Sequence, residues 1–253
     1  MTPILATDRL SRSFGGLRAV NEVTFSLAPG ARQALIGPNG AGKTTFVNIL
    51  TGVIAPSFGS IRLAGEDITR LSRHQRVRRG MVRTFQVNQL FPDLTPLESV
   101  LLAIFERDGK AANLRRPAWR EEAAAEEAAA ILARLKLADV MDLPTAEIAY
   151  GKRRQLEIAV ALACRPKLLL LDEPAAGVPD GERQDIMAAI AALPRDVAVL
   201  LIEHDMDLVF RFAERIAVLV GGTLLVEDVP ERVAADPRVR EAYLGESLDG
   251  RAA

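Results

Sequence analysis

The sequence predicts an α/β core with an antiparallel β subdomain near its N-terminus and an inserted α-helical subdomain. Strands and helices alternate at both ends of the chain, the composition of residues 92–163 is helical, and residues 33–50 read as strand, glycine-rich loop and helix. We expect residues 1–90 and 164–253 to form the core with its β subdomain, and residues 91–163 to form the helical subdomain.

The N-terminal elements are short strands separated by turns. Runs of β-forming residues predict strands at residues 4–6, 23–27, 33–36 and 61–63. Apolar residues at helical spacing predict a helix over residues 46–50, which stops at Gly52.

The later elements continue this pattern. Residues 121–137 are predicted to form a helix, because acidic residues lie in its first turns and basic residues near its end. Residues 111–120 before it are expected to be a mobile connection. Two buried parallel strands are predicted at residues 168–171 and 197–202. A helix is predicted at residues 206–214, and a hairpin is predicted from the strands 216–220 and 223–226.

Composition and charge exclude several classes of protein. With 32 Lys and Arg against 33 Asp and Glu, the net charge of −1 gives no drive toward nucleic acid. No apolar run approaches the ~20 residues that span a bilayer, and Asp8 and Arg9 interrupt any signal peptide. Cys164 is the single cysteine, so we expect a buried thiol in a reducing compartment, by default the cytoplasm.

Arginines are concentrated between Arg70 and Arg83. This segment has two interpretations, a phosphate-binding surface or a solvated helix face with surface ion pairs. The second is favoured, and His74 within the segment is expected to be solvated.

The segment from Gly37 to Thr44 fits the pattern G-x-x-x-x-G-K-[ST] in the strand–loop–helix context that the pattern requires. Its glycines allow a tightly wound loop whose amides, with the positive end of the following helix, converge on phosphate oxygens. Lys43 is expected to reach the β- and γ-phosphates, and the Thr44 hydroxyl to bind Mg²⁺. The alternative is a glycine-rich turn without a ligand. The predicted nucleotide-binding residues here are Gly37, Pro38, Asn39, Gly40, Ala41, Gly42, Lys43, Thr44 and Thr45.

Two acids and a histidine follow the predicted buried strands. Asp172 and Glu173 end the run of four leucines, at the edge where open α/β sheets bind ligands. Asp172 suits contact with Mg²⁺, and Glu173 suits polarising a water in line with the γ-phosphate. His204 follows the next strand and is a candidate γ-phosphate sensor. The alternatives are two surface acids before a proline and a structural histidine.

Read together with Gln86, these motifs resemble the nucleotide-binding subunit of an ABC transporter across almost the whole chain. Within that family the chain is most similar to the ATPases of branched-chain amino-acid importers and their urea or amide relatives. The segments that carry this second resemblance are Arg83–Gln86, Ala149–Gly151, Asp172–Gly177, Ile202–Met206 and Ala242–Gly245. The resemblance implies a P-loop NTPase core of RecA-like type.

The resemblance also implies roles for residues outside the loop. Phe14 stacks on adenine, although it could merely pack a turn. Gln86 contacts Mg²⁺ or water and senses the membrane subunit. Tyr150, Gly151 and Lys152 lie in the signature segment that faces the nucleotide of a second subunit.

Two departures from the family pattern lie at that implied interface. Ala149 lacks the serine hydroxyl of the usual signature, and Pro179 stands where the family has Asp or Asn. Residues 152–154 place three cations at the N-terminus of the following helix, where they oppose the helix dipole, and this arrangement favours an anion docked there. The alternative is that these charges are solvated and that Glu157 partly offsets Arg153.

The implied function is an ATPase that uses ATP and Mg²⁺ to power uptake of branched-chain amino acids or related small polar solutes. Its partners would be transmembrane permease subunits, a second related ATPase in a heterodimer and, indirectly, an extracytoplasmic solute-binding protein, with no nucleic acid. It would lie peripherally on the cytoplasmic side of the inner membrane. Alternatives are an ABC ATPase for lipid or lipopolysaccharide export, a soluble regulatory or repair ABC ATPase, and a small-molecule kinase.

Overall fold

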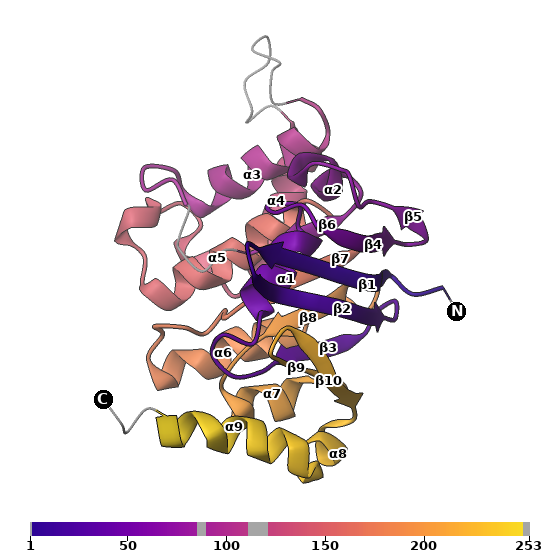
Figure 1. Cartoon of the computed structure of the whole chain (residues 1–253). Helices are drawn as coiled ribbons and strands as arrows, with labels where there is room; N and C mark the ends of the chain where they lie inside the picture. The colour runs from indigo at the N-terminus through magenta and orange to yellow at the C-terminus, as the bar shows by residue number, and fades with distance from the viewer. Residues whose placement is uncertain (1, 85–89, 111–120, 250–253) are drawn as a thin grey trace. The chain divides into compact units, whose positions relative to one another are not determined.

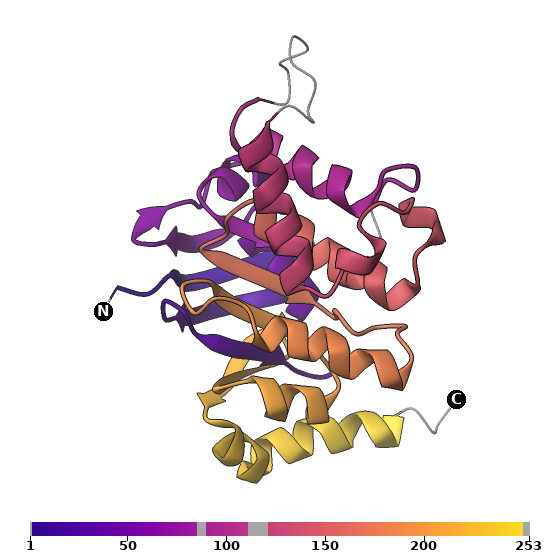
Figure 2. The ribbon, with the colours of Figure 1, turned by 180° about the vertical axis from the view of Figure 1, so that it is seen from behind.

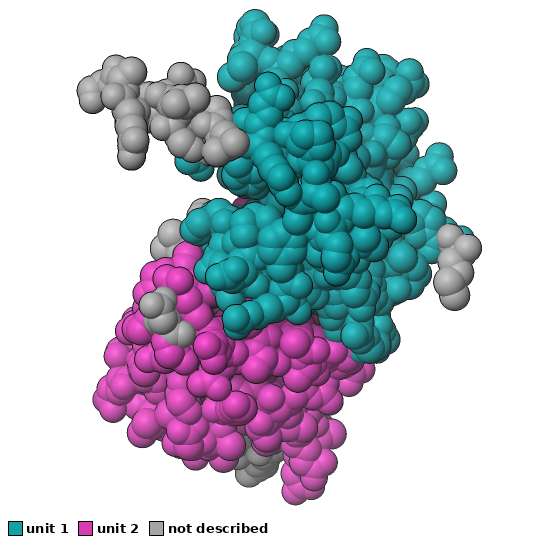
Figure 3. Space-filling model, turned by 90° about the horizontal axis from the view of Figure 1, so that it is seen from below, with its two compact units in different colours: residues 1–81, 167–173, 195–253 teal, residues 82–166, 174–194 magenta. Residues whose placement is uncertain are grey.

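The computed structural model describes residues 2–84, 90–110 and 121–249. The chain divides into two compact units, and Figure 3 colours them separately. Unit 1 contains residues 1–81, 167–173 and 195–253, and unit 2 contains residues 82–166 and 174–194. The predicted division at residues 91 and 163 stays a prediction.

Unit 1 contains an antiparallel sheet of order β2-β1-β4-β5 (Figure 1). Its strands are β1 (Leu5–Phe14), β2 (Leu17–Leu27), β4 (Phe58–Leu63) and β5 (Glu66–Asp67). The predicted antiparallel β subdomain is therefore confirmed, with strands longer than the sequence indicated. Register shifts along β1 interrupt the alternation of buried and exposed residues, which hides the strand from a period-two pattern.

The second sheet is mixed and has the order β10-β9-β3-β8-β7-β6. Its central strands β3, β7 and β8 are buried at every residue and pair in parallel, as the continuous apolar runs of β7 and β8 predicted for those two strands. β9 pairs in parallel with β3 and forms the predicted antiparallel hairpin with β10. The strand bounds are β3 (Arg32–Ile36), β6 (Met81–Arg83), β7 (Leu168–Asp172), β8 (Ala198–Ile202), β9 (Arg215–Val220) and β10 (Thr223–Asp228).

The helices of unit 1 cover the mixed sheet from both faces. α1 packs into one apolar cluster with both sheets, where the rings of Phe25 and Phe46 meet edge to face at 5.9 Å. A separate cluster joins α7 and α8 to β3 and β9. The helix bounds are α1 (Lys43–Leu50), α2 (Arg73–Arg78), α7 (Met206–Phe212), α8 (Pro230–Ala235) and α9 (Pro237–Asp249).

The arginine-rich segment fits neither predicted interpretation completely. Arg79 makes a surface ion pair with Glu66 at 2.7 Å, and His74 is exposed, as expected for a solvated face. Arg76, however, is only 2% exposed. Its guanidinium donates to the carbonyls of Ile49 and Leu50 at 2.7 and 2.5 Å, so it satisfies the last turn of α1.

The described residues of unit 2 are helical apart from the end of β6 and connecting loops. α3, α4 and α5 pack against one another (Figure 1; from behind, Figure 2). α3 begins with a capping box between Thr95 and Glu98, followed by Pro96 at the first helical turn. The helix bounds are α3 (Pro96–Arg107), α4 (Glu122–Arg134), η2 (Ala138–Val140), η3 (Thr145–Glu147), α5 (Tyr150–Ala163) and α6 (Asp180–Ala191).

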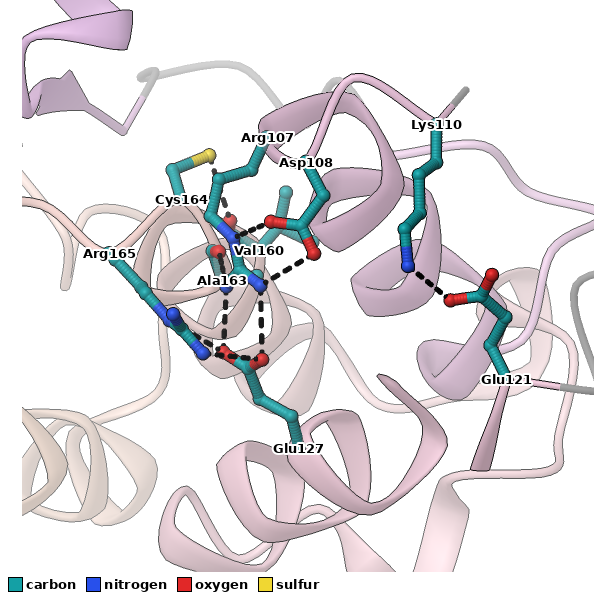
Figure 4. Close-up of polar contacts among 9 residues, drawn as sticks. All are labelled: Arg107, Asp108, Lys110, Glu121, Glu127, Val160, Ala163, Cys164 and Arg165. Carbon is teal, nitrogen blue, oxygen red and sulfur yellow. Dashed lines mark hydrogen bonds and ion pairs between the residues drawn. The ribbon is translucent and has the colours of Figure 1, made fainter. Parts of the chain in front are cut away.

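An ion-pair network joins α3, α4 and the end of α5 (Figure 4). Arg107 at the end of α3 donates to Glu127 on α4 at 2.7 Å and to the carbonyl of Ala163 on α5 at 2.8 Å. Arg165 pairs with the same Glu127 carboxylate at 2.9 Å. The expected burial of Cys164 is partial, and burial raises the pKa of its thiol.

Candidate functional site

The glycine-rich loop is wound closely against its neighbours in unit 1. Gly42 has φ 96°, and a Cβ on it would lie 2.3 Å from the carbonyl oxygen of Ala19. A Cβ on Gly37 would lie 2.1 Å from the carbonyl oxygen of Leu219. The Gly222 amide donates to the Ala41 carbonyl at 2.9 Å. β2, β9 and the β9–β10 turn therefore fix the loop, and glycine is required at both positions.

A cavity of about 420 Å³ lies over this loop and the N-terminal end of α1. Lys43 opens the helix and donates to the Pro38 carbonyl at 2.8 Å and to the Gly37 carbonyl. The helix end contributes positive potential to the cavity. The lining residues are Leu17, Arg18, Ala19, Asn39, Gly40, Ala41, Gly42, Lys43, Thr44, Thr45, Glu173, Gly221 and Gly222.

Glu173 is delivered to this cavity by the end of β7. Its backbone has φ 47°, a conformation that is costly for a residue with a side chain. The Glu173 amide donates to the Ile202 carbonyl of β8 at 2.9 Å, which stabilises that turn. Asp172, the last residue of β7, is 7% exposed, whereas the Glu173 side chain is 26% exposed. The turn therefore separates one buried acid from one that faces the cavity.

His204 lies beside Glu173, as their common position at the sheet edge predicted. Its Nδ1 is 3.5 Å from Glu173 Oε1. The imidazole remains exposed, with 69% of the side chain accessible. Glu203, which precedes it, is 2% exposed, and burial raises the pKa of its carboxyl.

The predicted adenine contact, Phe14, lies outside the cavity lining in this structure. Phe14 is 44% exposed, and the Arg12 guanidinium lies 4.7 Å from its ring centroid. Phe14 does not line the cavity, but Leu17, Arg18 and Ala19 do. Sequence reasoning missed Leu17, whose signal is an apolar side chain that stays 67% exposed beside a polar loop.

The signature segment lies in unit 2, at the start of α5. The Gly151 amide donates to Glu182 Oε2 of α6 at 3.1 Å. A Cβ on Gly151 would lie 2.0 Å from that oxygen, so glycine admits the carboxylate to the helix N-terminus. The Tyr150 hydroxyl donates to the Ala176 carbonyl at 3.4 Å. Sequence reasoning missed Glu182 as a cap, because its partner is 31 residues away.

Two of the three cations at residues 152–154 make ion pairs within unit 2. Lys152 donates to the Asp139 carboxylate at 2.5 and 2.7 Å. Glu157 pairs with Arg154 at 3.0 Å, and not with Arg153 as the alternative interpretation expected. Arg153 and Arg154 also lie 5.9 and 5.3 Å from the Tyr150 ring centroid.

Two further site predictions concern metal binding and the membrane subunit. Gln86 lies outside the described residues. Across residues 2–84, 90–110 and 121–249, no three His, Cys, Asp or Glu side chains form a cluster suited to a metal ion. Over the same described ranges, no helix has the length and apolar character needed to cross a bilayer.

Comparison with known proteins gives a consistent result. The family model "ABC transporter" matches residues 20–176, and the model "Branched-chain amino acid ATP-binding cassette transporter" matches residues 223–249. The high-affinity branched-chain amino acid transport ATP-binding protein BraF of Pseudomonas aeruginosa is 43% identical over 97% of this chain and 99% of its own length. The corresponding LivG protein of Escherichia coli K12 is 40% identical with the same coverage.

Solved structures agree with these matches. The crystal structure of the ADP conformation of MJ1267, an ATP-binding cassette of an ABC transporter, superposes with a TM-score of 0.85. It is 32% identical and covers 97% of this chain and 100% of that chain.

Proposed function

This chain is an ATPase of the ABC transporter family, of the branched-chain amino acid type, and from that premise we propose that it powers uptake of branched-chain amino acids or related small polar solutes through separate transmembrane subunits. The C-terminal family match at residues 223–249 supports import over lipid export or a repair role. The net charge of −1 also argues against a nucleic-acid partner.

The observation that carries the proposal is the cavity in unit 1. The glycine-rich loop, Lys43 at the N-terminus of α1, and Glu173 all line it. That arrangement suits a triphosphate held by its phosphates with an acid beside the terminal one. Lys43, which donates to loop carbonyls, would exchange these acceptors for β- and γ-phosphate oxygens.

The donor set also fits Mg²⁺. Thr44 lines the cavity with a hydroxyl oxygen, and Asp172 ends β7 directly before the cavity-lining Glu173. Both are hard oxygen donors of the kind Mg²⁺ uses together with phosphate oxygens and water. With Gln86 as a third ligand, these residues would hold the ion, which neutralises charge on the phosphates when bound.

We assign the hydrolytic step to Glu173 and His204. The Glu173 carboxylate would accept a hydrogen bond from the attacking water and orient it toward the γ-phosphorus. His204, whose Nδ1 lies 3.5 Å from Glu173 Oε1 and whose side chain is exposed, would contact the γ-phosphate itself. The strained turn at Glu173 fixes this acid on the sheet edge and limits its rearrangement.

The nucleobase has two candidate contacts, Phe14 at the end of β1 and Leu17 at the start of β2. Leu17 already lines the cavity, whereas Phe14 would have to leave its contact with Arg12 to stack on a base. We therefore assign Leu17 an apolar contact with the base or ribose and keep Phe14 as the proposed stacking residue.

Assembly with other subunits follows from the same premise. A second related ATPase would receive Tyr150, Gly151 and Lys152 at its nucleotide, and Ala149 and Pro179 favour a heterodimer because both depart from the family's usual interface. Permease subunits would hold the pair at the cytoplasmic face of the inner membrane, and an extracytoplasmic solute-binding protein would supply the solute.

Affinity purification of the tagged chain from its native membrane tests this assignment. We expect permease subunits and a second ABC ATPase to copurify, and the complex to hydrolyse ATP faster when solute-loaded binding protein is added. A complex in which this chain is the single kind of ABC ATPase, and which still couples ATP hydrolysis fully to the solute-loaded binding protein, would contradict the heterodimer. Copurification with nucleic acid instead of membrane proteins would contradict the transport role.

A further inference from the structure

Glu203 is a buried acid beside the proposed hydrolytic residues. It follows β8 directly and is 2% exposed. Burying a carboxyl group costs free energy that an apolar residue of similar size would not. The cost calls for a physical explanation, and none of the steps assigned above uses Glu203.

The two carboxyl oxygens of Glu203 have different surroundings. Oε2 accepts a hydrogen bond from the His204 amide at 3.1 Å. Oε1 is buried and has no hydrogen-bond partner within the described part of the chain, and the Asp205 amide also favours the ionised carboxyl group. Oε2 therefore fixes the main chain of the turn at His204, and the same oxygen also faces the imidazole Nδ1 at 3.8 Å.

The His204 imidazole stands between two carboxylates. Its Nδ1 lies 3.8 Å from Glu203 Oε2 and 3.5 Å from Glu173 Oε1. Both separations exceed the usual hydrogen-bond range, so a small rotation of the ring would complete one bond at the expense of the other. A single Nδ1–H cannot serve both acceptors.

This competition matters because Glu173 has another task in the proposed mechanism. If Glu173 accepted the Nδ1–H during hydrolysis, one of its oxygens would be withdrawn from the attacking water. A second acceptor for Nδ1–H releases Glu173 and also fixes which ring nitrogen carries the hydrogen.

We propose that Glu203 is a positioning residue for ATP hydrolysis, which holds His204 by its amide and by Nδ1 so that Glu173 is free to orient water. The inference rests on the proposed roles of Glu173 and His204. It adds a residue that acts through His204 and does not touch the nucleotide.

Histidine-selective nitrogen NMR of the isolated full chain tests the contact without any nucleotide. The chain has two histidines, so the spectrum contains signals from His204 and from the exposed His74 of α2. A His74→Gln variant assigns them. Glu203→Gln should shift the Nδ1 and Nε2 signals of His204, because an amide replaces the carboxyl group beside the ring, and should leave His74 unchanged. Unchanged His204 signals in folded Glu203→Gln would overturn the proposal.

Kinetics separate positioning from a merely structural role. In the assembled transporter, Glu203→Gln should lower kcat by about 10- to 100-fold with KM for ATP unchanged. Glu203→Asp, which keeps the carboxyl group, should recover part of that loss, and the nucleotide affinity of the isolated chain should match the wild type in both variants. An unchanged kcat, or equal losses in kcat for both variants, would overturn the inference. Absence of ATP binding by the wild-type chain would instead contradict the proposed function.

Discussion

Replacing the buried Arg76 by methionine tests how the helix behind the phosphate loop is held. The Arg76 guanidinium donates to four main-chain carbonyls, at distances of 2.5 to 3.0 Å. Two of them end α1, and the other two belong to residues 69 and 71. Methionine fills most of the space of the arginine stem but donates no hydrogen bond.

The size of the effect follows from these contacts. A hydrogen bond with a charged partner is worth about 1.5–3 kcal/mol, so four bonds amount to about 6–12 kcal/mol before compensation. Removing the charge recovers several kcal/mol of desolvation cost, and burial does lower the pKa of Arg76. We therefore expect Arg76→Met to lower the free energy of unfolding by about 2–4 kcal/mol.

Urea unfolding followed by circular dichroism measures this difference. Arg79→Met is the matched control in the same segment, because its surface pair with Glu66 is worth about 0–1 kcal/mol. Arg76→Lys should fall between the wild type and Arg76→Met, since an ammonium keeps the charge but reaches fewer carbonyls. Equal unfolding free energies for Arg76→Met and Arg79→Met would refute the assigned role of Arg76.

Three further predictions concern the site and unit 2. Glu173→Gln should keep ATP affinity and slow phosphate release by about 10²- to 10⁴-fold; unchanged release would remove Glu173 from the chemistry. Leu17→Ala should weaken ATP binding by up to about 1 kcal/mol in calorimetry without affecting inorganic tripolyphosphate, and equal losses for both ligands would argue against a base contact. Arg107 holds the pKa of the Glu127 carboxyl below its ordinary 4.5, so Glu127→Gln should lower the free energy of unfolding by its full amount above pH 4.5. This difference from the wild type should disappear as the pH falls below 4.5 and Glu127 becomes protonated; a pH-independent difference would contradict this ion pair.

The loop and the acids of the site could be predicted from sequence because their signals are local. The spacing from Gly37 to Thr44 specifies a phosphate loop only between a strand and a helix, and both neighbours were visible as apolar patterns. The strand that ends in Asp172 and Glu173 was equally clear, since strands buried on both faces are continuously apolar. Parallel pairing of β7 with β8 then brings Glu173 and His204 to one edge.

Other features depend on contacts between distant segments and left no local signal. Arg76 satisfies carbonyls that precede it by more than 25 residues, so its charge alone suggested a solvated surface. Glu182 reaches Gly151 from another helix. β6 has three residues, too few for a period to be read. In each case contacts between segments distant in the sequence determine the structure, and local sequence patterns do not reveal those contacts.

The most direct test of the account is calorimetric titration of the purified chain with Mg·ATP, in the wild type and in Lys43→Ala. We expect saturable one-site binding by the wild type, and in Lys43→Ala a loss of affinity under conditions where the variant remains folded. A folded wild-type chain that shows no binding, alone or with its copurifying subunits, would contradict the central claim that residues 37–45 hold a nucleoside triphosphate.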